Sequence, residues 1–389
     1  MDILNSAFGY QTSFVIMKIG IDARLIGETG VGRYIRNLIT NLSVQDKSNE
    51  YVLYLRDAHY RSFVLPGERW SKVRAEVPWH SLKEQVLMPW FFMKSGLDLV
   101  HVPYFTIPIF YPGRMVVTIH DLTILHFDTG KATTLPWIVY KFRRLGYRIA
   151  LAVGLFRARK IIAVSKTTKQ EIIDHFHMNP GKIVVTYEGV DEQVKSQKSK
   201  VKSEDSIIRE PYFLYVGNAY PHKNLETLLE AFGQIRNQES RIRNIKLVLV
   251  GKDDYFYSRL KKLVQEQRLA DSTIFFGEAD DGQLSHLYRH AQALVFPSLM
   301  EGFGLPALEA LAFGCPVIAS DIPVFHEILG DNAMYFHALD AGDLGEKLTY
   351  VLERHPVGQR RTTVRLQDRF SWSRLASDTL TIYEGCARV

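Results

Sequence analysis

Short apolar runs rich in β-branched residues alternate with helix-like segments along most of this chain of 389 residues. The strand-like runs of the first half are 15–22, 51–55, 97–103, 114–121, 158–165 and 182–189, and the segment 32–42 has the apolar spacing of a helix. Continuous apolar strands separated by helices predict a parallel sheet that is covered on both faces. The first half therefore predicts a doubly wound α/β domain.

A second series of the same kind follows. Its strand-like runs are 211–218, 245–252, 273–278, 293–298 and 315–320, and its helix-like runs are 224–235, 257–267 and 281–291. Because the chain is too long for one ordinary core, the two series predict two doubly wound, Rossmann-like α/β domains in tandem. Ligands of such sheets lie beyond the carboxyl ends of the strands, so the two domains are expected to face each other across a cleft.

The segment 191–210, DEQVKSQKSKVKSEDSIIRE, breaks this pattern and is polar and rich in lysine and serine. Such a composition predicts a linker, with a long surface loop inside one domain as the alternative. We therefore expect a first domain over 17–190 and a second domain that starts at 211. Residues 1–16 precede the first strand-like run and are expected to be an extension, since either Met1 or Met17 could be the start of translation.

Charge is divided unevenly between the halves. Residues 1–190 contain 24 Lys and Arg against 15 Asp and Glu, whereas the rest contains 24 against 27. A basic first half favours an anionic partner, but no nucleic-acid-binding motif is present and no nucleic-acid partner is expected. The chain has no apolar run long enough to span a membrane, no signal-like N-terminus and no cysteine pair that suggests a disulfide or zinc site, which favours a cytoplasmic setting.

The segment EGFGLPALEALAFGCPVIASDIPVFHE, residues 301–327, places two glutamates eight positions apart. A helix is expected to begin near Pro306 and to end at Gly314 as its C-cap. The preceding loop then lies at a strand's carboxyl end and a helix N-terminus, where backbone N–H groups favour a phosphate. Glycines at 302 and 304 would let the backbone approach it. Glu309 is expected to bind ribose hydroxyls and Glu301 a second sugar, which together describe a nucleotide sugar.

These residues resemble the group 1 (family 4) retaining glycosyltransferases of the GT-B fold, from about Lys18 onward. The spacing of Glu301 and Glu309 matches the family's pair of glutamates, and PSLMEGFGLPALEALAFGCPVIASDIPVFHEI is close to the family pattern over its whole length. The resemblance implies that Gly302, Phe303, Gly304 and Leu305 help to bind the donor. It also implies that 369–389, which begins near the motif Phe370-Ser371-Trp372, forms a helix crossing back to the first domain, leaving 211–368 as the nucleotide-sugar-binding domain.

Other family motifs can be placed on the first domain. GETGVGRY, residues 27–34, resembles the glycine-rich loop after the first strand, so Gly30 and Gly32 are expected beside the donor diphosphate and the acceptor. His120 resembles a histidine that contacts the transferred sugar, although a histidine packed at a strand end is the structural alternative. The turn formed by Glu188, Gly189 and Val190 resembles one that closes the first domain, and we expect its role to be structural. Ser165 is expected to be a helix N-cap.

The segment VGNAYPHKN, residues 216–224, resembles a family segment in which a lysine binds the donor phosphates. Lys223 takes this position, and Asn218 is expected to bind the donor as well. His222 departs from the family pattern, because many relatives have an arginine there, and this leaves the second phosphate-neutralising charge in doubt. Arg33 or the helix dipole could compensate for it.

The resemblance implies a retaining transfer in which the leaving phosphate helps to deprotonate the acceptor. His120 or Asp121 acting as the base is a weaker hypothesis. No D-x-D motif is present, so we expect neither a metal nor a cofactor. The sequence also resembles bacterial mannosyltransferases of surface polysaccharide synthesis, which makes GDP-mannose the leading donor, with UDP-hexoses and dTDP-rhamnose as alternatives. Non-catalytic nucleotide-sugar binding is the alternative from a different class, and a dehydrogenase is disfavoured because no G-x-G-x-x-G opens a helix.

The expected acceptor is a saccharide or a polyprenyl-linked saccharide. The stretch KFRRLGYRIALAVGLFRARK, residues 141–160, carries seven basic residues and an apolar face. Basic amphipathic stretches suit an anionic membrane, so peripheral association with the inner face of the plasma membrane is one interpretation. A core helix with a solvated basic face is the other.

Overall fold

The structure is a computed structural model that describes residues 16–79, 81–127, 137–190, 208–238, 244–354 and 369–387. The expected N-terminal extension lies outside these residues except for Ile16. The expected linker also lies outside them, except for residues 208–210.

The first sheet contains seven parallel strands in the order β3-β2-β1-β4-β5-β6-β7. Its strands are β1 (Lys18–Asp22), β2 (Glu50–Leu55), β3 (Trp70–Arg74), β4 (Leu99–Val102), β5 (Met115–Ile119), β6 (Lys160–Ala163) and β7 (Ile183–Val185). Its helices are α1 (Gly30–Gln45), α2 (Asp57–Tyr60), α3 (Leu82–Lys94), α4 (Thr123–His126), α5 (Trp137–Arg157) and α6 (Lys166–Phe176).

The second sheet contains six parallel strands in the order β10-β9-β8-β11-β12-β13. Its strands are β8 (Tyr212–Val216), β9 (Lys246–Val250), β10 (Thr273–Gly277), β11 (Leu294–Phe296), β12 (Val317–Ser320) and β13 (Ala333–Phe336). Its helices are α8 (Leu225–Gln238), α9 (Tyr255–Glu266), α10 (Asp281–His290), α11 (Leu305–Ala312), α12 (Pro323–Leu329) and α13 (Ala341–Arg354). The prediction of two doubly wound, Rossmann-like domains is confirmed.

Local sequence explains how several of these elements begin. The Ser165 side chain accepts a hydrogen bond from the Thr168 N–H, so its predicted role as the N-cap of α6 is confirmed. Asp280 and Gln283 form a reciprocal capping box at the start of α10. The central strands of both sheets are largely buried, in keeping with their apolar sequences. Propensity and burial therefore favour the same elements.

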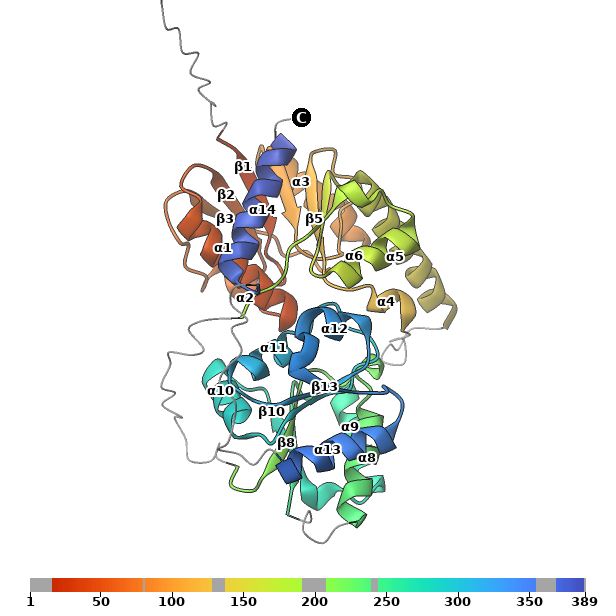
Figure 1. The fold of residues 1–389 in the computed structure, drawn as a ribbon. Helices are drawn as coiled ribbons and strands as arrows, with labels where there is room; N and C mark the ends of the chain where they lie inside the picture. The colour runs from red at the N-terminus through yellow and green to blue at the C-terminus, as the bar shows by residue number, and fades with distance from the viewer. Residues whose placement is uncertain are drawn as a thin grey trace, which may run out of the picture.

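The last helix, α14 (Trp372–Ala387), lies against the first domain although it follows the second in sequence (Figure 1). The Tyr383 hydroxyl lies 2.6 Å from Nδ1 of His101, and Nε2 of that histidine lies 2.8 Å from the Thr118 hydroxyl. All three side chains are fully buried. Gly189 allows the close approach of the start of α14, because a Cβ at this position would overlap the backbone of Trp372.

The carboxyl ends of the two sheets face each other in the middle of the molecule (Figure 1). The loop after β5 meets the loop after β11 there, and the start of α1 lies against α10 and α11. In the part of the chain that the structure describes, no helix has the length and apolarity needed to cross a membrane.

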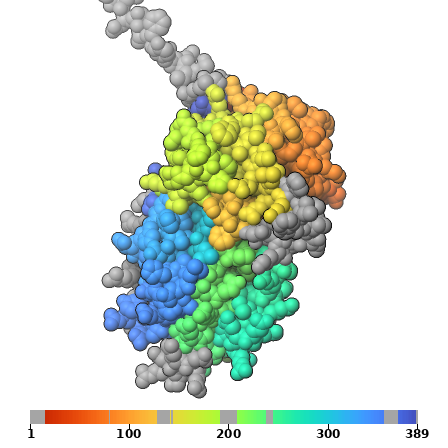
Figure 2. Space-filling model, turned by 90° about the vertical axis from the view of Figure 1, so that its right-hand side faces the viewer, coloured from red at the N-terminus to blue at the C-terminus, as the bar shows by residue number. Residues whose placement is uncertain are grey.

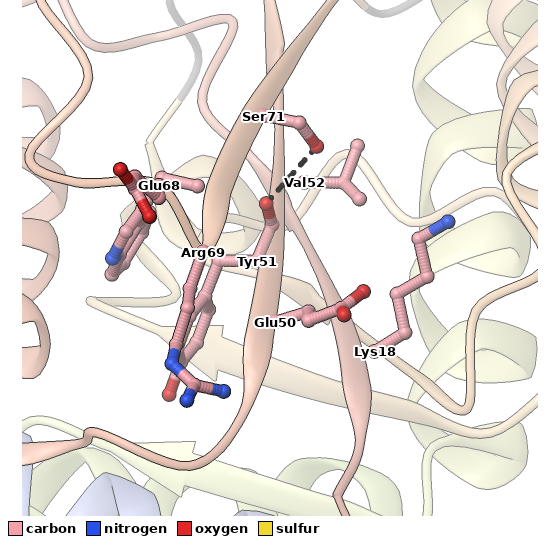
Figure 3. A pocket seen from close by; sticks show the side chains of 8 residues that line it. Lys18, Glu50, Tyr51, Val52, Glu68, Arg69 and Ser71 are labelled. Atoms are coloured by element: carbon pink, nitrogen blue, oxygen red, sulfur yellow. Dashed lines mark hydrogen bonds between the residues drawn. The ribbon is translucent and has the colours of Figure 1, made fainter.

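A hollow of about 400 Å³ lies at the opposite, amino-terminal ends of β1, β2 and β3 (Figure 3). It is lined by Lys18, Glu50, Tyr51, Val52, Glu68, Arg69, Trp70 and Ser71. Because ligands of doubly wound sheets bind at the carboxyl ends of strands, this hollow is not the candidate site.

Candidate active site

The glycine-rich loop after β11 leads directly into α11, as the sequence indicates. Gly304 precedes the helix with φ of +93°, a left-handed conformation that favours glycine. The helix begins at Leu305, one residue before the expected position, with proline in its first turn. At its far end the C-cap is Phe313, so the prediction that Gly314 is the cap is wrong by one residue. Gly314 follows in the left-handed conformation.

Glu309 lies on α11 and is only 7% exposed. One of its carboxylate oxygens accepts a hydrogen bond of 3.0 Å from the Tyr288 hydroxyl. The other pairs with the Arg33 guanidinium, which comes from α1 of the first domain and also donates to Asp281 at 2.7 Å. Arg33 thus links the two domains through its contact with Glu309, the carboxylate that the sequence predicts to bind ribose.

Glu301 lies on the loop before α11 and pairs with Lys223, whose ammonium nitrogen is 2.5 Å from a carboxylate oxygen. The Ser298 hydroxyl donates to the same oxygen at 2.7 Å. The side chains of Glu301 and Lys223 are both mostly buried. The residue predicted to bind phosphate and the residue predicted to bind the sugar are therefore neighbours.

The remaining second-domain residues of the predicted site lie close by. The Asn218 side-chain oxygen accepts a hydrogen bond from the Tyr220 N–H at 3.3 Å, and its backbone carbonyl accepts one from the Tyr215 hydroxyl. Phe303 is buried, and its ring packs against those of Tyr187 and Phe370. Phe303 thus packs between the domains and anchors the loop by apolar contact.

The two predicted glycines of the first domain differ in their surroundings. A Cβ at Gly32 would lie 2.6 Å from the carbonyl oxygen of Ile26, so this glycine permits tight packing of α1 on the preceding loop. Gly30 is exposed and begins α1, and a Cβ there would meet no atom within 4 Å. Space for a ligand therefore exists at Gly30 and not at Gly32.

Gly302 lies where the backbones of the two domains approach each other closely. A Cβ at this position would overlap the backbone carbonyl of His120, and the Thr168 hydroxyl donates weakly to the carbonyls of both residues. From the sequence, Gly302 was expected to let the backbone approach a phosphate. In the structure the close neighbour of Gly302 is the first domain's backbone.

His120 follows β5 and has both ring nitrogens beside acceptors. Its Nδ1 lies 3.0 Å from a Glu188 carboxylate oxygen, and its Nε2 lies 3.1 Å from the carbonyl oxygen of Pro103. With Glu188 ionised, both nitrogens must carry a proton to make these bonds. In this arrangement the ring has no lone pair with which to accept a proton from a substrate.

Glu188 is a residue whose part in this site was missed in the sequence. It is 4% exposed, and carboxylates are rarely buried without a partner. The available signal in the sequence was a carboxylate directly after a strand, in a turn expected to be mainly structural. Asp121, next to His120, has one carboxylate oxygen bonded to the Thr123 N–H at 2.8 Å. Asp121 lies close to Gly302 across the domain interface.

His222, the departure from the family pattern, is buried, and its Nδ1 has no hydrogen-bond partner among the described residues. Burial, with a smaller effect from the neighbouring Lys223 charge, lowers the pKa of His222 to about 3. The ring is therefore neutral near pH 7 and supplies no second positive charge for a diphosphate. Arg33 is a cation that the structure places beside Glu309.

A second link between the domains involves Glu327 of α12, which the sequence analysis did not single out. Its carboxylate accepts hydrogen bonds from the backbone N–H groups of Lys166 and Thr167, at 2.6 and 2.8 Å, and from the Tyr187 hydroxyl at 3.0 Å. The first two donors lie at the N-terminus of α6, where a carboxylate is favoured. Glu327 therefore ties the second domain to the first.

A hollow of about 370 Å³ lies on the first domain, at the carboxyl ends of β1, β2 and β3. Its lining includes Glu28, Arg56, Glu76 and Trp79, and the guanidinium of Arg56 lies over the indole of Trp79. A concave surface with carboxylates, a cation and an aromatic face suits a hydroxyl-rich ligand.

Two family models match nearly the whole described chain. The model for Glycosyltransferase Family 4 matches residues 29–194, and the model for Glycosyl transferases group 1 matches residues 195–364. The chain belongs to the group 1 glycosyltransferases. It is a glycosyltransferase, and the predicted family is confirmed.

Named relatives of this glycosyltransferase support the assignment. It is 32% identical to the O-antigen chain mannosyltransferase RfbU of Salmonella typhimurium over 62% of this chain and 61% of that protein. It is 27% identical to the O-antigen chain mannosyltransferase B of Escherichia coli over 92% of this chain and 96% of that protein. Among solved structures, sucrose-phosphate synthase from Thermosynechococcus elongatus superposes with a TM-score of 0.74 at 21% identity, covering 95% and 98% of the chains. This last similarity concerns the fold.

Proposed function

We propose that this glycosyltransferase moves mannose from GDP-mannose, with retention of configuration and without a metal ion, onto a saccharide or lipid-linked saccharide acceptor in cell-surface polysaccharide synthesis. The observation that carries the proposal is the arrangement of Glu301 and Glu309 around one helix N-terminus, each carboxylate paired with a cation. The names of the two O-antigen relatives support mannose as the sugar.

The donor would occupy the loop and helix in the order of its parts. Glu309 would accept hydrogen bonds from the ribose hydroxyls, and Glu301 would accept them from the hexose. The diphosphate would lie at the N-terminus of α11, near Lys223 and Arg33, where N–H groups and positive charge favour an anion. Because Lys223 and Arg33 are already paired with carboxylates, donor binding would exchange these ion pairs for contacts with phosphate and release the carboxylates toward the sugars.

In the proposed reaction, the bond between the mannose anomeric carbon and the phosphate oxygen breaks, and a bond to an acceptor hydroxyl oxygen forms on the same face. The acceptor proton passes to the leaving phosphate, and Lys223 and Arg33 stabilise the departing diphosphate. His120 would be a positioning residue and not the base. To accept the proton of the acceptor hydroxyl, it would have to break one of its two hydrogen bonds. The hollow beside Trp79 is our candidate for the acceptor saccharide. It lies at the carboxyl ends of β1, β2 and β3, on the side of the first domain that faces the second.

A thermal-shift panel of GDP, UDP, ADP and dTDP, each with and without its sugar, tests the donor. A ligand at about 100 times its Kd stabilises the native state by about 2.7 kcal/mol, which corresponds to roughly 5 to 10 °C for a domain of this size. We expect this shift with GDP and GDP-mannose in the wild type. Glu309→Ala should lose most of it, while the control Glu226→Ala, at an exposed position on α8, should keep it.

A shift with UDP or dTDP alone would replace the proposed donor and leave the fold and family unchanged. No shift with any nucleotide would show that the donor site does not work as described. Incubation of the shifting donor with an acceptor saccharide, with and without EDTA, then tests catalysis. Transfer that stops in EDTA would contradict metal independence, and an inverted product by NMR would contradict retention.

A further inference from the structure

Large hydrophobic side chains are exposed mainly on one part of the first domain. Sixteen are exposed among the described residues, and ten of these lie on α3, on α5 or on the loop between β4 and β5. They are Leu82, Val86, Leu87, Trp90, Met93, Phe110, Leu145, Ile149, Val153 and Phe156. Isolated exposed apolar residues are ordinary, but a concentration of this kind marks an interaction surface.

The exposed side chains follow helical spacing on both helices. On α3 they recur at Leu82, Val86, Trp90 and Met93, and on α5 at Leu145, Ile149, Val153 and Phe156. Intervals of three and four residues place each set along one stripe of its helix. A surface helix of a globular protein normally turns such a stripe toward the core. These two helices each present one to the outside.

The two stripes belong to one continuous face, here called the α3–α5 face. The loop 103–111 lies between the helices: the Gln85 side chain of α3 donates to the Ile107 carbonyl, and Arg157 of α5 donates to the Tyr111 carbonyl. Phe110, which is 65% exposed, projects from this loop. Figure 2 shows α5, in yellow, beside the orange segments of the first domain on one side of the molecule.

The segments that carry this face are strongly basic in sequence. The segments 82–94, 103–114 and 137–160 contain ten Lys and Arg and a single acid, Glu84. Glu84 is 1% exposed and pairs with the buried Arg24. Lys83, Lys94, Arg148 and Arg157 are exposed around the apolar stripes, and the ammonium of Lys94 lies 5.1 Å from the centre of the Trp90 ring. Basic residues flank the apolar ones, and no exposed acid is found among the described side chains of these segments.

We propose that the α3–α5 face docks on a bilayer that contains anionic lipids. Apolar side chains enter the boundary of the acyl chains while the surrounding lysines and arginines bind lipid phosphates. The aromatic residues Trp90 and Phe110 suit the interfacial region. A second copy of this chain is a poor occupant, because two such faces would bring like charges together without an acid to offset them.

The face is connected to the candidate active site by a single loop. The Pro103 carbonyl, at the start of that loop, bonds to His120, and the Tyr104 ring lies 6.3 Å from the His120 ring. Phe110 lies further along the loop and on the α3–α5 face. Docking would therefore place the site close to the membrane surface, where a lipid-linked saccharide presents its sugar. This part of the inference rests on the proposed function.

Co-sedimentation with vesicles tests the docking directly. We expect the full chain to bind vesicles that contain phosphatidylglycerol and to bind pure phosphatidylcholine at least tenfold less. The double variant Trp90→Glu with Phe156→Glu should lose about tenfold or more in partitioning. The control Val64→Glu with Leu339→Glu changes two exposed residues outside the face and should bind as the wild type does.

A charge variant, Lys83→Gln with Arg148→Gln, keeps every apolar contact. It should weaken binding by about fivefold per charge removed at low salt, and the difference should shrink as salt is added. Equal binding of both double variants and the wild type would overturn the proposal, as would a failure of the wild type to bind anionic vesicles. Thermal midpoints of all variants establish that they are folded.

Two further measurements separate this inference from the proposed function. Transfer to a short water-soluble acceptor should be unchanged in Trp90→Glu with Phe156→Glu, whereas transfer to a lipid-linked acceptor in vesicles should fall with membrane binding. Normal transfer to the soluble acceptor without vesicle binding would retain the function and reject the docking. Sedimentation analysis without lipid tests whether a second copy of this chain covers the face instead. A dimer that is broken by Trp90→Glu with Phe156→Glu would show that the α3–α5 face is a protein interface.

Discussion

The two domains share one architecture but use buried ionisable groups differently. Among the described residues, the buried acids, arginines and histidines of the first domain are Asp22, Arg24, Asp46, Glu84, His101 and Glu188, and those of the second are His222 and Glu309. The two in the second domain lie at the proposed donor site. Most of those in the first hold structural elements together. Buried acids and histidines of the second domain thus lie at the candidate site, whereas most of those in the first domain join structural elements.

Arg24 shows the structural use. Its guanidinium donates to Asp22 and Glu84, each at 2.6 Å, and to the Val77 carbonyl at 3.1 Å. These contacts join the end of β1 to the first turn of α3. The network therefore supports the α3–α5 face from the inside.

Arg24→Met gives the largest expected effect on stability. It leaves two buried carboxylates without their cation, and breaking a buried ion pair in this way costs about 3 to 5 kcal/mol. The first domain should unfold roughly 10 °C lower in calorimetry. Arg61→Met, at an exposed position, is the control and should change little. A midpoint within about 2 °C of the wild type would show that buried charge in this domain is not structural.

The pH dependence of stability separates the two buried histidines from the exposed ones. Burial lowers the pKa of His101 to about 3, and burial followed by the Lys223 charge does the same for His222. Because the unfolded chain binds the proton near pH 6.5 and the native state does not, stability is lost as pH falls from about 6.5 toward 3.

At pH 5, each of these histidines should cost about 2 kcal/mol. His222→Gln should therefore lose less stability than the wild type between pH 7 and pH 5, by about that amount, measured from thermal midpoints. Parallel pH profiles for the two proteins would contradict the burial of a neutral His222 and would restore it as a possible cation for the donor.

Glu327→Gln gives the smallest effect and tests the link between the domains. The amide keeps the shape but loses the charge that favours the N-terminus of α6, which is worth about 1 kcal/mol. We expect the KM for the donor to rise about fivefold, because closure becomes less favourable, with little change in either domain's melting. Glu353→Gln, exposed on α13, serves as the control. A lower melting temperature with an unchanged KM would make Glu327 a local cap only.

The sequence predicts most strands but misses those at two sheet edges. The segments that form β3, WSKVR, and β13, AMYF, were not predicted as strands. Each is an outer strand of its sheet, and Trp70–Arg74 mixes charged with apolar residues. An edge strand that is packed on just one side does not need a continuous apolar run. The pattern that identifies central strands therefore does not apply to it.

The candidate site shows a similar division between local and long-range information. Glu301, Gly304 and Glu309 lie within one loop and helix, so their spacing alone placed them together. Glu188 and Glu327 contact residues that are 68 and up to 161 positions away in sequence. Neither has a periodic or motif-based signal that names its partner, so Glu188 was missed as the partner of His120 and Glu327 as a link between the domains.

The amino-acid sequence by itself determined the two α/β series, the glycine-rich loop before α11 and the pair of glutamates, since these depend on short-range spacing and backbone preference. Only the tertiary structure decided that Arg33 crosses to Glu309, that His222 is buried and neutral, and that the apolar stripes of α3 and α5 share one face. The physical reason is that pairing, desolvation and exposure are set by neighbours brought together through folding, and these neighbours lie far apart in the chain.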